Sequence, residues 1–152
     1  MRNFTSLQFL IWLILLLSSA SAVKAQIIPD NTLDTENSIV TPLDQKSDRI
    51  DGGAIRDINL FHSFQEFNIN EGRGVYFSNP IGIENILTRV TGNNISNILG
   101  TLGVLGEANL FLLNPNCIFF GENAQLDVNG SFIASTEDAI KLGNNGYFSA
   151  TD

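Results

Sequence analysis

Apolar residues in this chain come in short runs that are separated by residues favouring tight turns. In the most regular stretch, three such runs occupy residues 110–113, 118–120 and 132–134. Between them stand the sequences Asn-Pro-Asn, Gly-Glu-Asn and Asn-Gly, which are typical of turns. No run has the length or the period of an ordinary helix. The pattern therefore predicts an all-β structure built from short strands.

One strand pattern occurs twice, at an offset of 24 residues. Residues 102–110 and residues 126–134 both begin with Leu, any residue and Val, and continue with Gly and two alternating apolar positions. Alternate residues of a strand face the same side. Repeats that expose one apolar face must stack on one another to bury it, as in a β-solenoid. We therefore expect a shared core that contains Leu102, Val104, Leu126 and Val128.

A tight turn follows the first of these runs and has a counterpart earlier in the chain. Residues 75–83 and residues 110–118 both consist of a strand, Asn-Pro, one further residue, then Gly82 or Cys117, and Ile. Asn and Pro suit the first two positions of a type I turn. Since Gly82 stands at the position of Cys117, that position is expected to have a positive φ angle. Cys would cost about 1 kcal/mol there relative to Gly.

The stretch from about residue 50 to residue 136 resembles the haemagglutination-activity domain of filamentous-haemagglutinin-like proteins. That domain is the amino-terminal secretion domain of two-partner secretion exoproteins. The family pattern has Gly at the position of Cys117, which is the one clear departure. The matching segments are residues 59–69, 74–77, 86–92, 95–98, 109–121 and 130–136.

The resemblance implies a right-handed parallel β-helix with amino-terminal capping strands over residues 26–152, truncated at its carboxyl end. It also implies that the chain is not an enzyme and is recognised by the periplasmic part of an outer-membrane transporter. The longer exoprotein would engage surface ligands of host or neighbouring cells through downstream sequence. The motif that the family links to secretion corresponds to Asn114, Pro115, Asn116, Cys117 and Ile118. The earlier turn, with Asn79, Pro80 and Gly82, is a secondary motif.

The amino terminus reads as a secretory signal peptide, residues 1–25. A basic residue, Arg2, precedes an apolar run over residues 7–17, and small residues follow it. The run is too short for a comfortable membrane span. Cleavage is expected after Ala25, with Ala22 as the alternative. The predicted location is therefore the cell surface or the extracellular space, reached through the periplasm of a Gram-negative type of envelope.

The acidic balance of the chain argues against several classes of partner. The whole chain has eight basic and sixteen acidic residues, a net charge of −8. Removing the signal takes away Arg2 and Lys24, so the remainder has a net charge of −10. Nucleic acid and anionic membrane surfaces would repel such a chain, so neither is an expected partner.

The residues that could carry chemistry are few. Cys117 is the only cysteine and His62 the only histidine, so neither a disulfide within the chain nor a Cys–His pair close in sequence is available. We expect no cofactor, no metal site and no catalytic residues. A β-helical carbohydrate-active enzyme would need converging carboxylates, and here they are dispersed. A stand-alone surface adhesin stays open as an alternative function.

The sequence also gives expectations for individual segments. Residues 26–43 are expected to form capping strands, residues 44–51 a charged loop, and residues 84–89 a strand or irregular structure. Two strands, residues 60–61 and 67–69, should flank a bend, and the chain after Thr136 should begin another coil. Asn residues at corners would either hydrogen-bond along the solenoid axis or contact the transporter, and both readings stay open. They are Asn79, Asn94, Asn97, Asn114, Asn116, Asn123 and Asn129.

Overall fold

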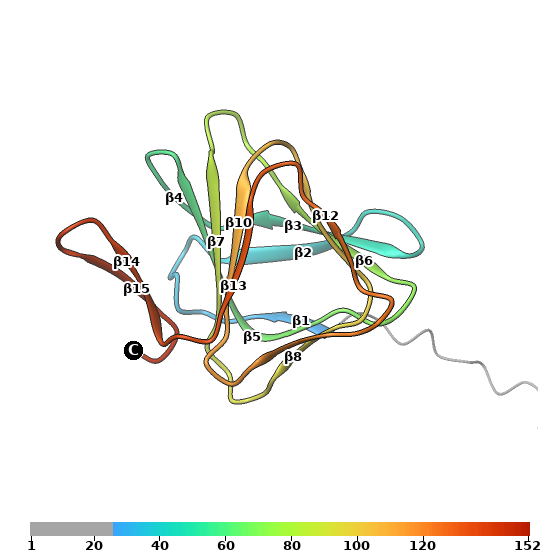
Figure 1. Cartoon of the computed structure of the whole chain (residues 1–152). Helices are drawn as coiled ribbons and strands as arrows, with labels where there is room; N and C mark the ends of the chain where they lie inside the picture. The colour runs from blue at the N-terminus through green and yellow to red at the C-terminus, as the bar shows by residue number, and fades with distance from the viewer. Residues whose placement is uncertain (1–25) are drawn as a thin grey trace, which may run out of the picture.

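Figure 1 shows a computed structural model, which describes residues 26–152, so the predicted signal peptide lies outside the described residues. Every regular element in this range is a strand, and none of its segments is a helix that could span a membrane. The strands are β1 (Gln26–Pro29), β2 (Ser38–Pro42), β3 (Ser47–Gly52), β4 (Ala54–Arg56), β5 (Asn59–Asn68), β6 (Gly74–Ser78), β7 (Asn85–Val90), β8 (Ser96–Ile98), β9 (Thr101–Leu105), β10 (Asn109–Leu113), β11 (Ile118–Phe120), β12 (Gln125–Asp127), β13 (Phe132–Ser135), β14 (Ala139–Leu142) and β15 (Gly146–Ser149).

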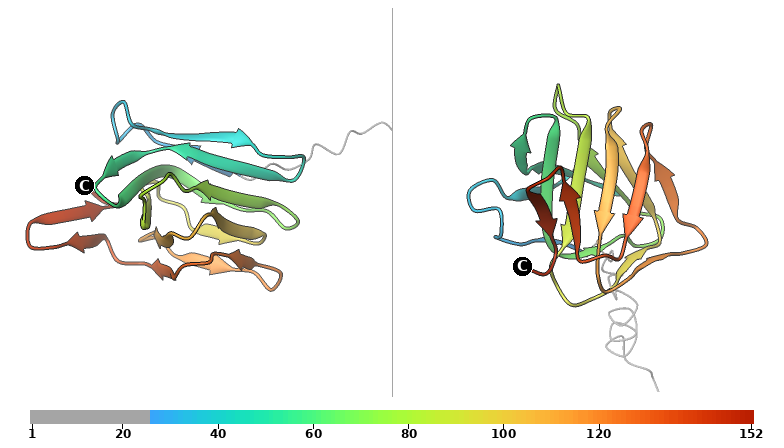
Figure 2. Two further views of the ribbon diagram at one scale, coloured as in Figure 1. Left: turned by 90° about the horizontal axis from the view of Figure 1, so that it is seen from above. Right: turned by 60° about the vertical axis from the view of Figure 1, so that its left-hand side comes forward.

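The strands wind into four stacked coils. The first coil contains β3 and β5, the second β6, β7 and β8, the third β9, β10 and β11, and the fourth β12 and β13. Strands of successive coils pair in parallel in every case, and Figure 2 shows the coils lying one above the other. The predicted right-handed parallel β-helix is confirmed.

The sequence repeat places part of the register correctly. Leu102 pairs with Leu126, as the offset of 24 residues predicted. The next strands, however, pair Leu110 with Phe132, although the pattern had matched Leu110 with Ala134. Leu102 and Leu110 are eight positions apart, whereas their partners Leu126 and Phe132 are six positions apart, so the offset does not persist around the coil. Register in a solenoid is set separately at each corner.

The predicted shared core is present, but its last coil is only partly covered. Leu102 and Val104 are buried, whereas Leu126 is 50% exposed and Val128 packs against the core from a half-buried position. Leu126 belongs to the fourth coil, which has no further coil stacked on it among the described residues. We call this the open end of the solenoid.

Two strands cover the opposite end, which we call the capped end. β1 pairs antiparallel with β5 and β2 pairs antiparallel with β3, so the prediction of capping strands is confirmed. The predicted loop over residues 44–51 is wrong, because most of it forms β3. Opposite charges at Arg49 and Asp51 make a 2.7 Å ion pair with each other, while Ile50 between them is fully buried in the core. A charged sequence thus satisfies the alternation of a strand.

Two further expectations need correction. The segment with the three phenylalanines is one continuous strand, β5, instead of two strands around a bend. The chain after Thr136 forms an antiparallel hairpin, β14–β15, instead of another coil. The hairpin lies beside the solenoid near β4 (Figure 1). There the rings of Phe148 and Phe61 meet edge to face, 4.9 Å apart, so both faces of β5 are covered by apolar groups. The segment 84–89 lies mainly in β7, as favoured.

Candidate functional site

Asn114 occupies the corner between β10 and β11 and is fully buried. Its side-chain Nδ2 donates to the carbonyl oxygen of Asn94 at 3.0 Å and to Ser96 Oγ at 2.9 Å. Its Oδ1 accepts from the backbone N–H of Asn116 at 2.9 Å. Both the amide nitrogen and the amide oxygen of the buried Asn114 side chain thus have hydrogen-bond partners inside the protein. The carboxamide ties the third coil to the second.

The rest of this corner is a tight turn with a strained fourth residue. The N–H of Cys117 donates to the carbonyl oxygen of Asn114 at 3.2 Å, and Asn116 Nδ2 donates to the carbonyl oxygen of Gly92 at 2.8 Å. Cys117 has a φ angle of 106°, so the predicted positive φ is confirmed. Non-glycine residues in such regions store on the order of 1–3 kcal/mol. The thiol is exposed, and Ile118 then enters β11 opposite Ser96.

The earlier motif lies at a different corner, between β6 and β7. Asn79 Nδ2 donates to the carbonyl oxygen of Ile83 at 3.0 Å, and its Oδ1 accepts from the N–H of Ala108 at 2.9 Å. Gly82 has a φ angle of 87°, and Ile81 at the tip of the turn is fully exposed. A Cβ on Gly106 would lie 2.3 Å from Asn79 Oδ1, so only glycine leaves room for this contact.

The two motifs therefore resemble each other locally without stacking. Asn114 bonds back to the second coil, whereas Asn79 bonds forward to the third coil through Ala108. Residues 75–83 and residues 110–118 are alike in sequence because the same kind of turn occurs at two different corners. The structure does not bring these two motifs together into a single site.

A ladder of three stacked asparagines was missed by the sequence reasoning. Asn85 Nδ2 donates to Asn59 Oδ1 and Asn109 Nδ2 donates to Asn85 Oδ1, each at 3.0 Å. Asn109 Oδ1 in turn accepts from the N–H of Ser131 at 2.8 Å. Each of these asparagines stands directly before a Leu or Ile that begins an apolar run. That shared position is the pattern by which the ladder could have been found.

The asparagines expected at corners make more varied contacts. Two of them bond to asparagines of the preceding coil: the N–H of Asn97 donates to Asn68 Oδ1 at 2.9 Å, and Asn114 donates to the carbonyl oxygen of Asn94. Three others donate to glutamates of other coils. These pairs are Asn94 with Glu66 at 2.5 Å, Asn123 with Glu71 at 2.5 Å, and Asn129 with Glu107 at 3.2 Å.

A buried polar network around Arg89 joins the capped end to the hairpin. Arg89 Nε donates to Ser63 Oγ at 2.9 Å and Nη2 to Thr32 Oγ1 at 2.9 Å. Nη1 donates to the carbonyl oxygen of Ser149, and the guanidinium lies 4.8 Å from the centre of the Phe148 ring. Burial lowers the pKa of Arg89 while Asp30 acts to raise it. One side chain on β7 thus contacts the cap, β5 and the hairpin.

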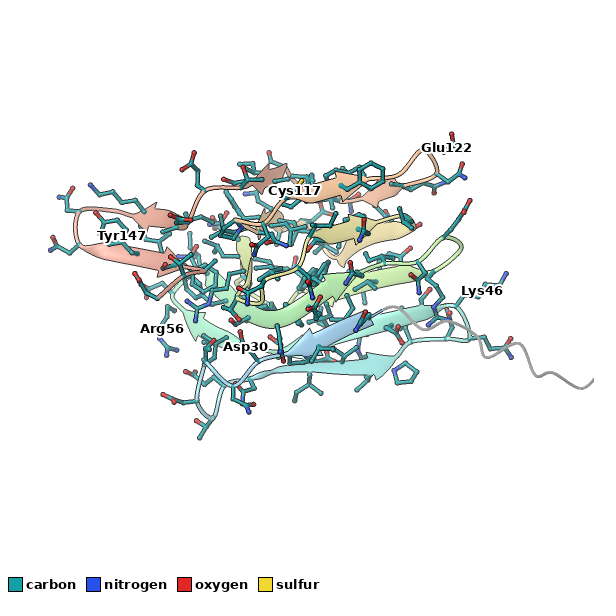
Figure 3. All side chains as sticks on the ribbon, turned by 90° about the horizontal axis from the view of Figure 1, so that it is seen from below. Asp30, Lys46, Arg56, Cys117, Glu122 and Tyr147 are labelled. Carbon is teal, nitrogen blue, oxygen red and sulfur yellow. The ribbon has the colours of Figure 1, made fainter. Side chains whose placement is uncertain are left out.

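Asp30 supplies the negative charge of this network. Its carboxylate accepts from Thr32 Oγ1 at 2.6 Å, Thr91 Oγ1 at 2.5 Å and Ser63 Oγ at 2.8 Å. Burial alone would raise the pKa of Asp30, but these hydrogen bonds outweigh it and bring the pKa below the ordinary 3.8. In Figure 3, Asp30 lies toward the capped end of the solenoid and Cys117 toward the open end.

His62 is fully buried in the first coil. Its Nδ1 lies 2.9 Å from Ser38 Oγ, its Nε2 has no hydrogen-bond partner, and the Phe77 ring is 5.2 Å away. Burial lowers the pKa of His62 to about 4, although Asp51 acts to raise it. The imidazole is therefore neutral at physiological pH. Within residues 26–152, no group of three or more His, Cys, Asp or Glu side chains could hold a metal ion.

Comparisons with known proteins agree with the fold and extend it. A family model described as "TPS secretion domain" matches residues 25–152. The "Heme/hemopexin-binding protein" of Haemophilus influenzae is 34% identical over 83 residues, which are 55% of this chain and 9% of that protein. This chain thus spans only a small part of that relative's length.

A solved structure shares the architecture. The crystal structure of a filamentous hemagglutinin secretion domain matches with a TM-score of 0.60 and 22% sequence identity, covering 77% of this chain and 44% of that chain. The structural match supports the fold, while the family model covers the whole described range. The chain therefore belongs to the TPS secretion domain family, the secretion domains of two-partner secretion exoproteins.

Proposed function

We propose that this domain carries an exoprotein across two membranes in an unfolded state and folds at the cell surface. Residues 1–25 direct the chain to the periplasm and are then removed. The periplasmic domains of an outer-membrane transporter bind the unfolded chain, adding its extended segments to their sheets. The family match supports the proposal, because two-partner secretion exoproteins leave the cell through the periplasm and an outer-membrane transporter. Ligands on host or neighbouring cells would be bound by the longer exoprotein.

The corner at residues 114–118 is the recognition element in this proposal, with Asn79, Pro80 and Gly82 in a secondary role. The complete burial of Asn114 carries the argument. A transporter cannot reach a side chain that donates two hydrogen bonds inside the folded solenoid. Recognition of Asn114 must therefore precede folding. The same side chain then serves twice, first as a contact for the transporter and later as a bond between coils.

The domain works by binding and folding, and we assign it no catalytic step and no cofactor. The acidic side chains that the structure pairs are used in structural contacts. Asp51 and Asp48 make ion pairs with Arg49 and Arg73, and Asp30 accepts hydrogen bonds in the buried network. These contacts support a structural role for the carboxylates of this region.

The experiment compares two variants that break one hydrogen bond from its two sides. Asn114→Ala removes the donor, and Ser96→Ala removes the acceptor without altering the recognition corner. Both variants are secreted from cells with the cognate transporter, and the urea-unfolded chains are titrated onto its purified periplasmic domains. We expect Asn114→Ala to weaken binding of the unfolded chain about tenfold and Ser96→Ala to leave it unchanged.

Stability is measured alongside, since both substitutions weaken the folded domain. If export falls in both variants in proportion to their loss of stability, and unfolded binding is equal, Asn114 acts only in the fold. The recognition proposal would then be wrong. Blocking the transporter should separately leave the processed protein in the periplasm.

A further inference from the structure

A polar groove of about 400 Å³ follows the corner that leads into the sheet of β3, β6, β9 and β12. One register position supplies its floor, with Ser47, Gly74, Thr101 and Gln125 in successive coils. Because this row crosses the strands, the groove runs along the solenoid axis. Figure 3 shows Lys46 on this side toward the capped end and Glu122 on the same side toward the open end.

The ring of Tyr76 forms one wall of the groove and lies flat on the sheet. A Cβ on Gly103 would be 2.5 Å from Tyr76 Cε1, and a Cβ on Gly74 would be 2.9 Å from Cε2. The ring therefore rests on two glycines, one on its own strand and one on the next. Burial raises the pKa of Tyr76, and the neighbouring charge of Asp127 raises it further.

Several polar groups in the groove have no partner inside the protein. Within the described residues, the side chains of Thr101 and Gln125 make no hydrogen bond, and Lys46 takes part in no ion pair. Arg73 differs, because its guanidinium donates to the carbonyl oxygen of Gln45 at 2.8 Å and to Asp48 at 3.2 Å. The groove thus offers a hydroxyl, an amide and an ammonium group to a ligand.

A second recess of about 350 Å³ continues the groove around the corner. It shares Glu71 and Asn123 with the first, and these two side chains hydrogen-bond at 2.5 Å. Phe119, which is 51% exposed, and Leu99 line the far part. The combined surface therefore has an aromatic ring at each end and polar groups between them.

From this arrangement we infer that the groove binds a short, uncharged oligosaccharide along the solenoid axis. Sugars present apolar C–H faces that stack on aromatic rings and hydroxyls that need both donors and acceptors. Tyr76 and Phe119 supply the rings, and Thr101, Gln125 and Lys46 supply the polar groups. The volume lies within the ~300–1,000 Å³ of small-molecule sites. Polyanionic glycans are disfavoured, because the chain as a whole carries a net charge of −8.

The chain offers a simple optical probe for the test. Its one Trp lies at position 12, so residues 26–152 contain only Tyr76 and Tyr147 as tyrosines and no Trp. Tyr147→Phe leaves Tyr76 as the single tyrosine. Purified residues 26–152 with this substitution are titrated with cellotetraose, laminaritetraose, chitotetraose and maltotetraose, and with a heparin tetrasaccharide as the anionic probe. Calorimetry on the unmodified domain provides a second readout.

We expect at least one uncharged tetrasaccharide to give a saturable change in Tyr76 fluorescence. Thr101→Val and Gln125→Ala should each weaken binding about fivefold, the effect of one neutral hydrogen bond. Gln65→Ala is the matched control, since Gln65 is exposed on β5. Tyr76→Ala should abolish binding by calorimetry, with circular dichroism to confirm the fold.

Three outcomes would overturn the inference. They are no saturable binding of any uncharged probe, binding that Thr101→Val and Gln125→Ala leave intact, and binding of the heparin fragment alone. Because these measurements use the purified domain without a transporter, they leave the export proposal untouched, and failed export would equally leave this result unchanged.

Discussion

The first and fourth coils of the solenoid differ in what covers them. At the capped end, β1 and β2 pair with the first coil, and Arg89 links the cap to the hairpin. The aromatic rings of Phe64, Phe67 and Phe77 pack there with centroids 5.3–6.5 Å apart. At the open end, Leu126 and Ile133 are 50% and 48% exposed. Stability should therefore be concentrated in the first coils.

The difference teaches that burial in a solenoid depends on the neighbouring coil as much as on the sequence. Leu102 and Leu126 share a register position and the same local pattern, yet Leu102 is fully buried. Each coil buries its inward side chains against the coils on both sides. A strand with the correct alternation stays exposed where one neighbour is absent.

The largest expected effect tests this comparison directly. Leu102→Ala should destabilise the domain by about 3 kcal/mol, because it opens a cavity between two coils. Leu126→Ala should cost less than about 1 kcal/mol, because its side chain is half exposed. Urea unfolding of residues 26–152 measures both. Equal losses would mean that the open end is covered in solution, and the comparison of the two ends would fail.

The second effect uses pH to probe the capped end. His62 has a folded pKa of about 4 and an ordinary value of 6.5, so between these values the unfolded chain binds more protons. The contribution of the neutral His62 to the free energy of unfolding is therefore fully present above pH 6.5. It is lost as the pH drops toward 4, by roughly 3 kcal/mol in total.

Denaturant titrations from pH 7 to pH 4.5 measure this slope. His62→Gln is the control, and since His62 is the only histidine, the slope over that range should nearly vanish. The aspartates with lowered pKa values, such as Asp30, contribute mostly below that range, because their stabilisation is lost as the pH falls through their ordinary 3.8. Glu36, whose pKa is lowered from 4.5, contributes only near the lower limit of the range. An unchanged slope in His62→Gln would show that another group titrates.

The third effect concerns the link between the cap and the hairpin. Arg89→Met should cost about 2 kcal/mol, because Asp30 loses its buried counter-charge and the carbonyl of Ser149 loses a donor. The hairpin should then detach locally before the domain unfolds. Its single basic residue, Lys141, provides a trypsin site that reports detachment.

The matched control is Arg56→Met, which removes an exposed ion pair with Glu36. Exposed pairs of this kind contribute less than about 1 kcal/mol. Cleavage at Lys141 should therefore accelerate in Arg89→Met and stay slow in Arg56→Met. Equal cleavage rates in the two variants would mean that the aromatic contact of Phe148 holds the hairpin without Arg89.

The features of the fold that the sequence predicts are local ones. Short apolar runs and Asn- or Gly-bearing turns predicted the coils, since inward alternation and tight corners are local properties. The capping strands and the secretion function were predicted from the resemblance to the family. The register after Leu110 was predicted wrongly, because corner lengths vary while the strand pattern repeats.

The contacts between distant segments could not be predicted in this way. Arg89 joins Thr32, Ser63 and Ser149, which lie far apart along the chain and meet only after the coils stack and the hairpin docks. Nothing in the local pattern around Arg89 distinguishes it from a solvent-exposed arginine. β3 was missed because of its local sequence. Its charged residues suggested a loop, although Arg49 and Asp51 form an ion pair on one face of the strand and Ile50 between them is buried.

The smallest effect compares the two turn motifs with each other. Cys117→Gly should stabilise the domain by about 1 kcal/mol, because glycine adopts the observed φ of 106° without strain. Gly82→Ala should cost a similar amount, since Gly82 has a φ of 87° and open space around its Cα. The change there is purely conformational.

Thermal and urea unfolding of both variants measure these opposite shifts. The greater freedom of glycine in the unfolded chain reduces the gain at position 117, so the stabilisation should be somewhat smaller than the loss at position 82. If Cys117→Gly is instead destabilising, the exposed thiol makes a contact that outweighs the backbone strain. Export of Cys117→Gly separates recognition by the transporter from the stability of the folded turn. Recognition of the unfolded chain does not depend on a φ angle that exists only after folding, so export should stay unchanged while stability rises.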